Sequence, residues 1–160
     1  TVGDLGCILV FEPGRYLAGP AGVLLTEIIY IKDAETRSFA IVDAAMNDLV
    51  RPAMYDAHHE ILPVREPGTD DHTHSYDIVG PVCETGDTFA TQRDLPALTA
   101  GELVVIRDAG AYGAVMASGY NSRPLIAEVL VRGDSYSVVR VRQDIATMLA
   151  QESLADWQSE

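Results

Sequence analysis

The sequence predicts a mainly β domain whose short strands close into a barrel or pack as a sandwich. Aliphatic and β-branched runs recur along the chain, glycine, proline and aspartate separate them, and segments with helical spacing are few. The length of 160 residues, with 48% apolar and 22% charged residues, suits about one globular domain with a hydrophobic core. A disordered chain is therefore excluded.

Three strands are expected in the first part of the chain. The apolar run at 7–11 predicts a buried strand. Residues 23–31 and 38–42 are rich in β-branched and aliphatic residues and are separated by a charged break at 32–35, a pattern that predicts a hairpin.

The remaining strands are expected in the middle of the chain and in a second hairpin. This hairpin joins residues 126–131 to residues 136–142 around the turn at 133–135. In its later strand Val139 and Val141 alternate with arginines, which predicts one buried and one solvated face. Shorter strands are expected at 61–65, 76–82, 87–91 and 103–106.

Short helices are expected at three places. Asp144 is an N-cap candidate for a helix at 145–149, whose apolar stripe is expected to pack in the core. Residues 111–117 are helix-tolerant. Residues 52–55 predict one further turn, with proline at its start.

Charge and hydropathy exclude two classes of function. Eleven basic and 24 acidic residues give a net charge of −13, which disfavours nucleic-acid binding. The longest uncharged run, 109–122, is shorter than the ~18 to 20 residues that span a bilayer. Cys7 and Cys83 form no disulfide-framework pattern, so a reducing compartment, the cytoplasm, is expected.

Glu12, Pro13, Gly14 and Arg15 directly follow the apolar run at 7–11. A glycine at a strand exit lets backbone N–H groups approach an anion, and an arginine supplies a bidentate partner. The four residues therefore predict a phosphate site. An ordinary turn with a surface ion pair would contain the same residues.

Arg51 and Tyr55 stand four residues apart, so one helical turn places the guanidinium and the phenol on the same face. Such a pair suits a carboxylate ligand. The alternative is an arginine stem packed against a half-buried tyrosine.

Cys83 and Glu84 are neighbours in a turn between Gly80 and Gly86. A thiol beside a carboxylate in an accessible segment is a candidate for proton transfer, more so than Cys7 in its apolar run. The alternative is a cysteine that serves as a small hydrophobic residue.

The stretch from residue 70 to residue 77 contains carboxylates and imidazoles, which suit a metal. A polar loop between strands contains the same residue types, so we expect no metal there. His58 and His59 are expected to begin a strand and to be structural. The residues that resemble a metal cluster are Asp70, Asp71, His72, His74 and Asp77.

Several motifs occur in a fixed order along almost the whole chain. They are Glu12-Pro-Gly-Arg15, the run 46–55 with its Arg-Pro-Ala-Met-Tyr, Gly80-Pro-Val-Cys-Glu-Thr-Gly-Asp87, Gly110-Ala-Tyr112 and Tyr120-Asn-Ser-Arg-Pro124. This ordered set resembles the diaminopimelate decarboxylases, within the pyridoxal-phosphate decarboxylases that have an alanine-racemase-like barrel. Each motif alone is weak evidence, whereas the ordered set is specific.

The resemblance implies an N-terminal (β/α)8 barrel that carries the Schiff-base lysine, followed by a C-terminal β-barrel domain of the alanine-racemase and ornithine-decarboxylase type. Residues 1–20 would be the end of the first barrel, including its last strand, and residues 21–160 the C-terminal β-barrel domain with short helices. The first barrel is otherwise absent. The partners of this chain would be the N-terminal barrel of the same polypeptide and, in a homodimer with shared active sites, a second subunit.

The resemblance also implies roles for particular residues. Those implied to bind pyridoxal 5′-phosphate are Glu12, which would pair with the pyridinium nitrogen, Pro13, Gly14, Arg15 and Tyr112. Those implied to bind the amino-acid substrate are Arg15, Arg51, Tyr55, Glu84 and Tyr112. Cys83 would act in the neighbouring subunit's site, where it would donate the proton that replaces CO2.

The implied activity is decarboxylation of meso-2,6-diaminopimelate to L-lysine and CO2, the last step of lysine biosynthesis. Lys32 is the only lysine and lacks the context of the Schiff-base lysine, so the chain alone is expected to be inactive. A second interpretation is a decarboxylase of ornithine or arginine, whose substrates lack the second carboxylate that Arg51 and Tyr55 would hold. A third is a non-catalytic dimerisation or regulatory module of the same fold.

Overall fold

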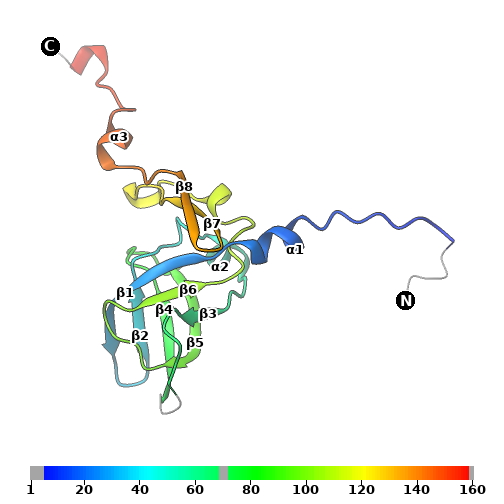
Figure 1. Ribbon diagram of the computed structural model, residues 1–160. Helices are drawn as coiled ribbons and strands as arrows, with labels where there is room; N and C mark the ends of the chain where they lie inside the picture. The colour runs from blue at the N-terminus through cyan, green and yellow to red at the C-terminus, as the bar shows by residue number, and fades with distance from the viewer. Residues whose placement is uncertain (1–5, 69–71, 159–160) are drawn as a thin grey trace.

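The computed structural model describes residues 6–68 and 72–158 and is mainly β (Figure 1). The strands are β1 (Leu24–Asp33), β2 (Ser38–Val42), β3 (Ile61–Pro63), β4 (Thr73–Val79), β5 (Thr88–Pro96), β6 (Leu103–Ile106), β7 (Glu128–Arg132) and β8 (Ser135–Arg140). The α-helices are α1 (Gly14–Ala18), α2 (Arg51–Tyr55) and α3 (Ile145–Leu149). Single 3₁₀ turns are η1 (Gly19–Ala21), η2 (Ala114–Met116), η3 (Tyr120–Ser122) and η4 (Asp156–Gln158). None of the helices within the described ranges has the length and apolar character that crossing a membrane requires.

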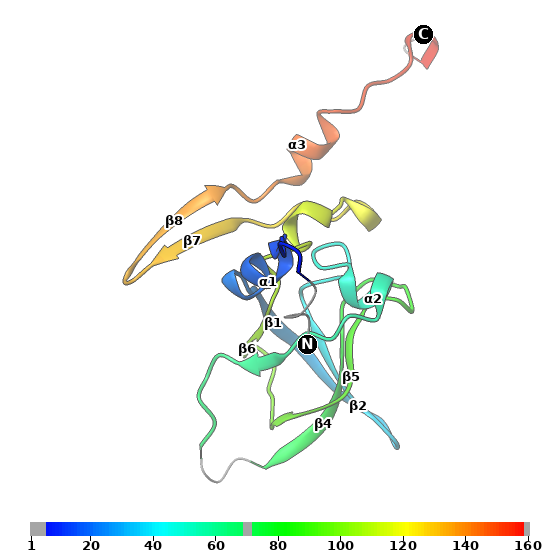
Figure 2. The same cartoon turned by 90° about the vertical axis from the view of Figure 1, so that its right-hand side faces the viewer.

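Six of the strands form one sheet that nearly closes on itself. Its order is β3-β6-β1-β2-β4-β5, and the two outer strands, β3 and β5, also approach each other. β2 and β4 are parallel, whereas the other neighbouring strands are antiparallel. The predicted β-barrel is therefore confirmed, and β7 and β8 form a separate hairpin outside it (Figure 2).

Both predicted hairpins are present. β1 pairs with β2 and β7 pairs with β8, each antiparallel. β6 has the bounds that the sequence predicts, α2 covers the predicted turn, and β4 begins three residues earlier than expected, at Thr73.

Aliphatic side chains fill the interior of the barrel. Leu24, Thr26 and Ile28 of β1 point inward and alternate with exposed residues, as a strand with one buried face requires. Burying one such aliphatic side chain contributes about 1.5 to 3 kcal/mol. The almost completely buried core residues include Ile28, Val42, Leu49, Ile61, Ile78, Val104 and Ile106.

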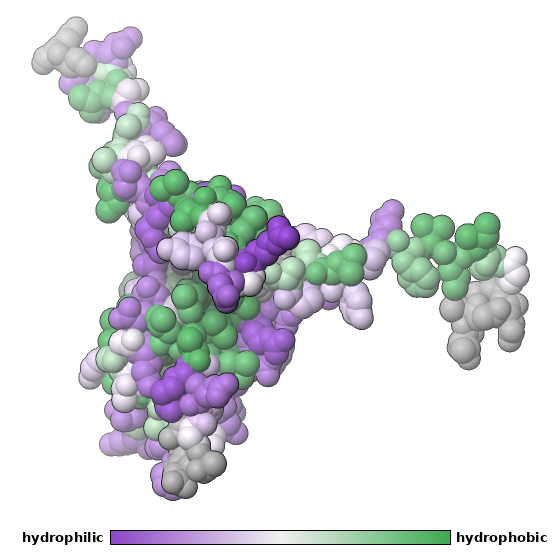
Figure 3. Space-filling view, in the orientation of Figure 1, coloured by the Kyte–Doolittle hydropathy of each residue, from purple (hydrophilic) through white to green (hydrophobic). Residues whose placement is uncertain are grey.

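Three predictions of buried apolar segments are wrong. Residues 7–11 form no strand and are exposed, with Ile8 91% and Phe11 76% accessible. Val139 and Val141 are exposed although they were expected to line a buried face, and the stripe of α3 is mostly exposed. Figure 3 shows apolar surface on the β7–β8 hairpin. The three predictions fail for the same reason: nothing within residues 6–68 and 72–158 covers these apolar side chains.

Two local predictions also need correction. Residues 111–117 form turns and η2 rather than one helix, because Tyr112 has a φ of +58°, outside the range of a right-handed helix. His58 and His59 precede the strand instead of beginning it, since β3 starts at Ile61, as predicted for the strand at 61–65.

A close backbone contact joins the segment after α1 to the turn after β6. A Cβ on Gly110 would overlap the carbonyl oxygen of Ala18 and lie 2.8 Å from the nitrogen of Gly22. In the same contact, the N–H of Ala109 donates to the carbonyl oxygen of Gly22 at 2.9 Å. Two glycines therefore allow α1 to lie beside this turn.

Gly110→Ala should lower the free energy of unfolding by about 1 to 3 kcal/mol, because the added methyl group forces the two backbones apart. Gly119→Ala is the matched control, since its nearest contact would be Met148 Cε at 3.8 Å. Urea unfolding compares the two variants. Equal losses of stability would contradict the role assigned to this contact.

Asp144 caps α3 as the sequence predicts. Its carboxylate accepts from the backbone N–H of Thr147 at 2.7 Å and from the Thr147 hydroxyl at 2.9 Å. These hydrogen bonds lower the pKa of Asp144 below its ordinary value of 3.8. Because the folded-state pKa is lowered, the cap stabilises α3 fully above pH 3.8 and is lost as the pH falls through the lowered pKa.

The backbone amide of Thr147 should therefore titrate with a midpoint below pH 3.8 in an NMR pH series. Asp144→Asn keeps a capping oxygen but no titrating group, so this transition should disappear in the variant. A midpoint at or above 3.8 would contradict the cap.

Candidate functional site

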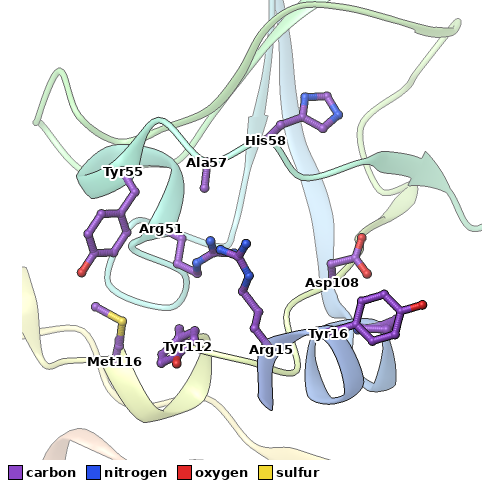
Figure 4. Close-up of a pocket in the computed structure, with 11 residues that line it drawn as sticks. Arg15, Tyr16, Arg51, Tyr55, Ala57, His58, Asp108, Tyr112 and Met116 are labelled. Carbon is purple, nitrogen blue, oxygen red and sulfur yellow. The ribbon is translucent and has the colours of Figure 1, made fainter. Parts of the chain in front are cut away.

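A pocket of about 830 Å³ opens between α1, α2 and the turn after β6 (Figure 4). Charged and aromatic side chains from these separate segments meet on its walls. The lining residues are Arg15, Tyr16, Gly19, Pro20, Arg51, Tyr55, Ala57, His58, Asp108, Tyr112 and Met116.

The local sequence explains how α2 presents its side chains to this pocket. Leu49 is buried just before the helix, and Pro52 occupies its first turn, where a missing N–H costs no hydrogen bond. Asp56 ends the helix in the left-handed region, with a φ of +51°. Within this one turn Arg51 and Tyr55 both line the pocket, as their spacing predicts.

Two guanidinium groups enter the pocket from different helices, Arg15 from α1 and Arg51 from α2 (Figure 4). Within residues 6–68 and 72–158, neither forms an ion pair with a carboxylate. The guanidinium of Arg51 is instead 3.3 Å from Nε2 of His59. Two cations without a carboxylate partner favour an anionic ligand, such as a carboxylate or a phosphate.

Aromatic rings and a thioether also line the wall. Tyr112 is about half exposed, and its positive φ turns it away from a helical path at the pocket edge. Tyr16, Tyr55 and Met116 add apolar surface. The combination of flat apolar side chains with two cations suits a planar ligand that carries an acidic group.

The loop at residues 80–87 carries Cys83 and Glu84, which are exposed and do not line the pocket. Asp87 fixes this loop by accepting the N–H of Val82 and the N–H of Met46, each at 2.7 Å. A Cβ on Gly80 would overlap the Asp87 carboxylate, so glycine lets the loop close around it.

Glu84 makes a second contact at the tip of this loop. The Tyr120 hydroxyl donates to its Oε2 at 3.4 Å. Tyr120 also borders a smaller hollow of about 180 Å³ next to Met46 and Val50. Glu84 is thus linked to the segment around η3 rather than to the large pocket.

Buried carboxyl groups lie beneath both α2 and this loop. Burial raises the pKa of Asp87 above 3.8, against the opposing effect of the N–H groups of Val82 and Met46. Burial likewise raises the pKa of Asp48, against the N–H of Ala45 and the charge of Arg123. For both groups the contribution to stability falls as the pH rises through these raised pKa values.

The structure brings together four of the predicted site residues and leaves five apart. Arg15, Arg51, Tyr55 and Tyr112 line one pocket. The predicted residues outside it are Glu12, Pro13, Gly14, Cys83 and Glu84. Their roles stay predictions.

Sequence reasoning missed part of the pocket wall. His58, which the sequence predicts to be structural, is exposed on the wall, and Asp108 is not among the predicted site residues. No local pattern marks either residue, since the close contact of Gly110 with the segment after α1 is what brings Asp108 to the pocket.

The acidic and histidine-containing stretch shows ordinary structural contacts. Asp77 is buried, 3.3 Å from Nη1 of Arg37, and accepts the N–H of Gln92 at 2.8 Å. His72 and His74 are exposed, and Asp70 and Asp71 lie outside the described residues. Among the residues described, no group of three or more His, Cys, Asp or Glu side chains could hold a metal.

Comparison with known families identifies the class of domain. Residues 15–110 match the family model of the C-terminal sheet domain of pyridoxal-dependent decarboxylases. The match covers more than half of the chain and includes the barrel and both arginines of the pocket. The chain belongs to this family.

Curated proteins similar to this chain include diaminopimelate decarboxylases from several bacteria. The chain is 53% identical over 151 residues to a diaminopimelate decarboxylase of Zymomonas mobilis, covering 94% of this chain and 35% of that protein. It is 55% identical over 146 residues to one from Pseudomonas fluorescens, covering 91% of this chain and 34% of that protein. The chain thus spans about a third of the length of these relatives.

Solved structures show the same relationship. Diaminopimelate decarboxylase from M. jannaschii, in co-complex with L-lysine, superposes with a TM-score of 0.83 at 33% identity, covering 88% of this chain and 32% of that one. A viral arginine decarboxylase matches with a TM-score of 0.63 at 19% identity, covering 68% of this chain and 30% of that one. The similarity to the viral arginine decarboxylase shows only that the two chains share a fold.

Asp87→Asn should lower the free energy of unfolding by about 1 to 3 kcal/mol, because an amide leaves one of the two buried N–H donors facing an NH2 group. Amide exchange at Met46 and Val82 should accelerate together. Asp94→Asn, at an exposed position of β5, is the control. If both variants unfold at the same urea concentration, Asp87 does not fix the loop.

Proposed function

We propose that this chain is the C-terminal part of a pyridoxal-phosphate-dependent decarboxylase that converts meso-2,6-diaminopimelate to L-lysine and CO2. The observation that carries the proposal is the convergence of Arg15 and Arg51 on one pocket without a carboxylate partner among the described residues. The curated relatives support the choice of substrate. The proposed location is the cytoplasm.

The substrate's own chemistry explains why two arginines are useful. Diaminopimelate has two amino-acid ends, so a carboxylate remains at the distal end while the other is lost. Arg51 and Tyr55, adjacent on α2, would hold that distal carboxylate through charge-assisted hydrogen bonds. Ornithine and arginine have no such group, and nothing in this pocket favours them.

The chain's residues fit part of a pyridoxal-phosphate site. The bound cofactor accepts the electrons left when CO2 departs. Arg15 would contact its phosphate and the substrate, Tyr112 would pack against its ring, and Glu12 would hold the pyridinium proton. Lys32 is exposed on the β1–β2 hairpin, away from the pocket lining, so the lysine that binds the cofactor would come from an N-terminal barrel.

The division into domains is part of the same proposal. Residues 1–20 would be the end of the N-terminal barrel, and residues 21–160 the C-terminal domain. The exposure of the segment at 7–11 and of the β7–β8 hairpin fits surfaces that this barrel or a second subunit would cover. In a homodimer, Cys83 and Glu84 would reach the partner's site, which suits their exposure outside this chain's own pocket.

Arg51→Ala in the complete enzyme should raise KM for meso-diaminopimelate about 10- to 150-fold, because a charge-assisted contact is worth about 1.5 to 3 kcal/mol. Arg51→Lys keeps the charge without the bidentate fork and should fall between the parent and the alanine variant. Affinity for pyridoxal phosphate, measured by its absorbance, should change little. Lys32→Ala, which removes an exposed cation of β1 outside the pocket lining, is the control.

An equal loss of cofactor binding in Arg51→Ala would contradict the assignment of Arg51 to the distal carboxylate. So would an unchanged KM.

Cys83→Ala should lower kcat about 10²- to 10⁴-fold with little change in KM, because it removes a proton donor rather than a binding contact. Mixing this variant with protomers that lack the Schiff-base lysine should restore activity, since one site of each heterodimer then carries neither defect. Heterodimers without activity, or parental turnover by Cys83→Ala, would exclude a site shared in this way.

A further inference from the structure

A buried imidazole lies between the pocket and the end of β6. His59 is 1% exposed and directly follows the pocket residue His58. Its Nδ1 is 2.7 Å from the carbonyl oxygen of Arg107, and its Nε2 is 3.3 Å from Nη1 of Arg51. His59 is therefore the link between a fixed backbone group and a pocket guanidinium.

The two partners determine which nitrogen carries the proton. A carbonyl oxygen only accepts hydrogen bonds, so Nδ1 of His59 must be the N–H donor to Arg107. A guanidinium only donates, so Nε2 must be the acceptor from Arg51. Both contacts are satisfied together by the neutral imidazole with its proton on Nδ1.

The backbone on the far side of His59 is held firmly. The N–H of Arg107 donates to the carbonyl oxygen of Glu60 at 2.8 Å, and the side chains of these two residues form an ion pair at 2.6 Å. The carbonyl that orients His59 is thus fixed relative to the segment that carries His59.

A neutral acceptor orients Arg51 without neutralising it. A carboxylate in the place of His59 would compete with an anionic ligand for the same charge. Within residues 6–68 and 72–158 no carboxylate pairs with Arg51, so its charge is left for a ligand. A side chain already held in place also loses less conformational freedom when the ligand binds.

We propose that His59 is a positioning residue, which holds the Arg51 guanidinium in the pocket for the distal carboxylate of the substrate. The inference rests on the proposed function for the identity of that ligand. It predicts that losing the Nε2 acceptor weakens substrate binding, whereas losing the Nδ1 donor alone does so much less.

Two substitutions separate the two ends of the imidazole. In His59→Gln the amide oxygen reaches the place of Nε2 and still accepts from Arg51. In His59→Asn the shorter amide still donates to Arg107 from the place of Nδ1 but does not reach Arg51. Both variants bury one amide, so a purely structural role for His59 predicts similar effects from both.

The test is steady-state kinetics of the complete enzyme, loaded with pyridoxal phosphate, on meso-diaminopimelate. His59→Asn should raise KM about tenfold, the loss of one hydrogen bond to a charged group, with a smaller change in kcat. His59→Gln should stay within about threefold of the parent KM. His72→Gln, at an exposed position before β4, is the matched control.

Equal increases in KM for the Gln and Asn variants, or no increase for the Asn variant, would overturn the proposal. A measurement on the parent protein does not depend on how the variants fold. Its ¹⁵N-histidine spectrum should show His59 protonated at Nδ1 and unprotonated at Nε2, and the opposite tautomer would also overturn the proposal.

A double-mutant cycle distinguishes the failure of this inference from the failure of the proposed function. In an Arg51→Ala background, His59→Asn should have no further effect on KM. If Arg51→Ala raises KM but His59→Asn does not, only the positioning role fails. If Arg51→Ala leaves KM unchanged, the assignment of Arg51 to the substrate fails, whatever the tautomer of His59.

Discussion

The turn at residues 43–49, most of which is buried, depends on polar contacts that tie it to three distant parts of the chain. Asp43 accepts from the Thr26 hydroxyl of β1 at 2.5 Å, and Asp87 accepts the N–H of Met46 from the other side. Arg123 donates to the carbonyl oxygen of Asp43 at 2.6 Å. Because α2 starts directly after this turn, the same contacts determine where the pocket arginine of α2 lies.

These contacts explain why buried charge is tolerated in a small barrel. Removing a carboxylate from water is costly, and the raised pKa values of Asp48 and Asp87 reflect that cost. Backbone N–H groups and the charge of Arg123 offset part of it. Because hydrogen bonds are directional, these contacts also fix one conformation of the turn, which apolar packing alone would do less strictly.

Sequence reasoning predicted the parts of the fold that local patterns determine. The two hairpins, β6 and α2 follow from β-branched runs, turn residues and a four-residue spacing. Burial at 7–11, in β8 and in α3 was predicted wrongly because an apolar pattern shows that a surface needs cover but not which part of a protein supplies it. The same limit applies to the pocket. The four-residue spacing of Arg51 and Tyr55 predicts that both side chains lie on one face. The orientation of His59 could not be predicted, because it depends on a carbonyl group 48 residues away in the sequence.

The β7–β8 hairpin has a consequence for work with this chain in isolation. It is a two-stranded sheet, so among the described residues each strand has an edge of unpaired backbone groups, and its valines face solvent. Open, apolar strand edges recruit further strands from other molecules, which makes them sites of aggregation. In the isolated chain, this hairpin rather than the well-packed barrel is therefore the expected site of aggregation.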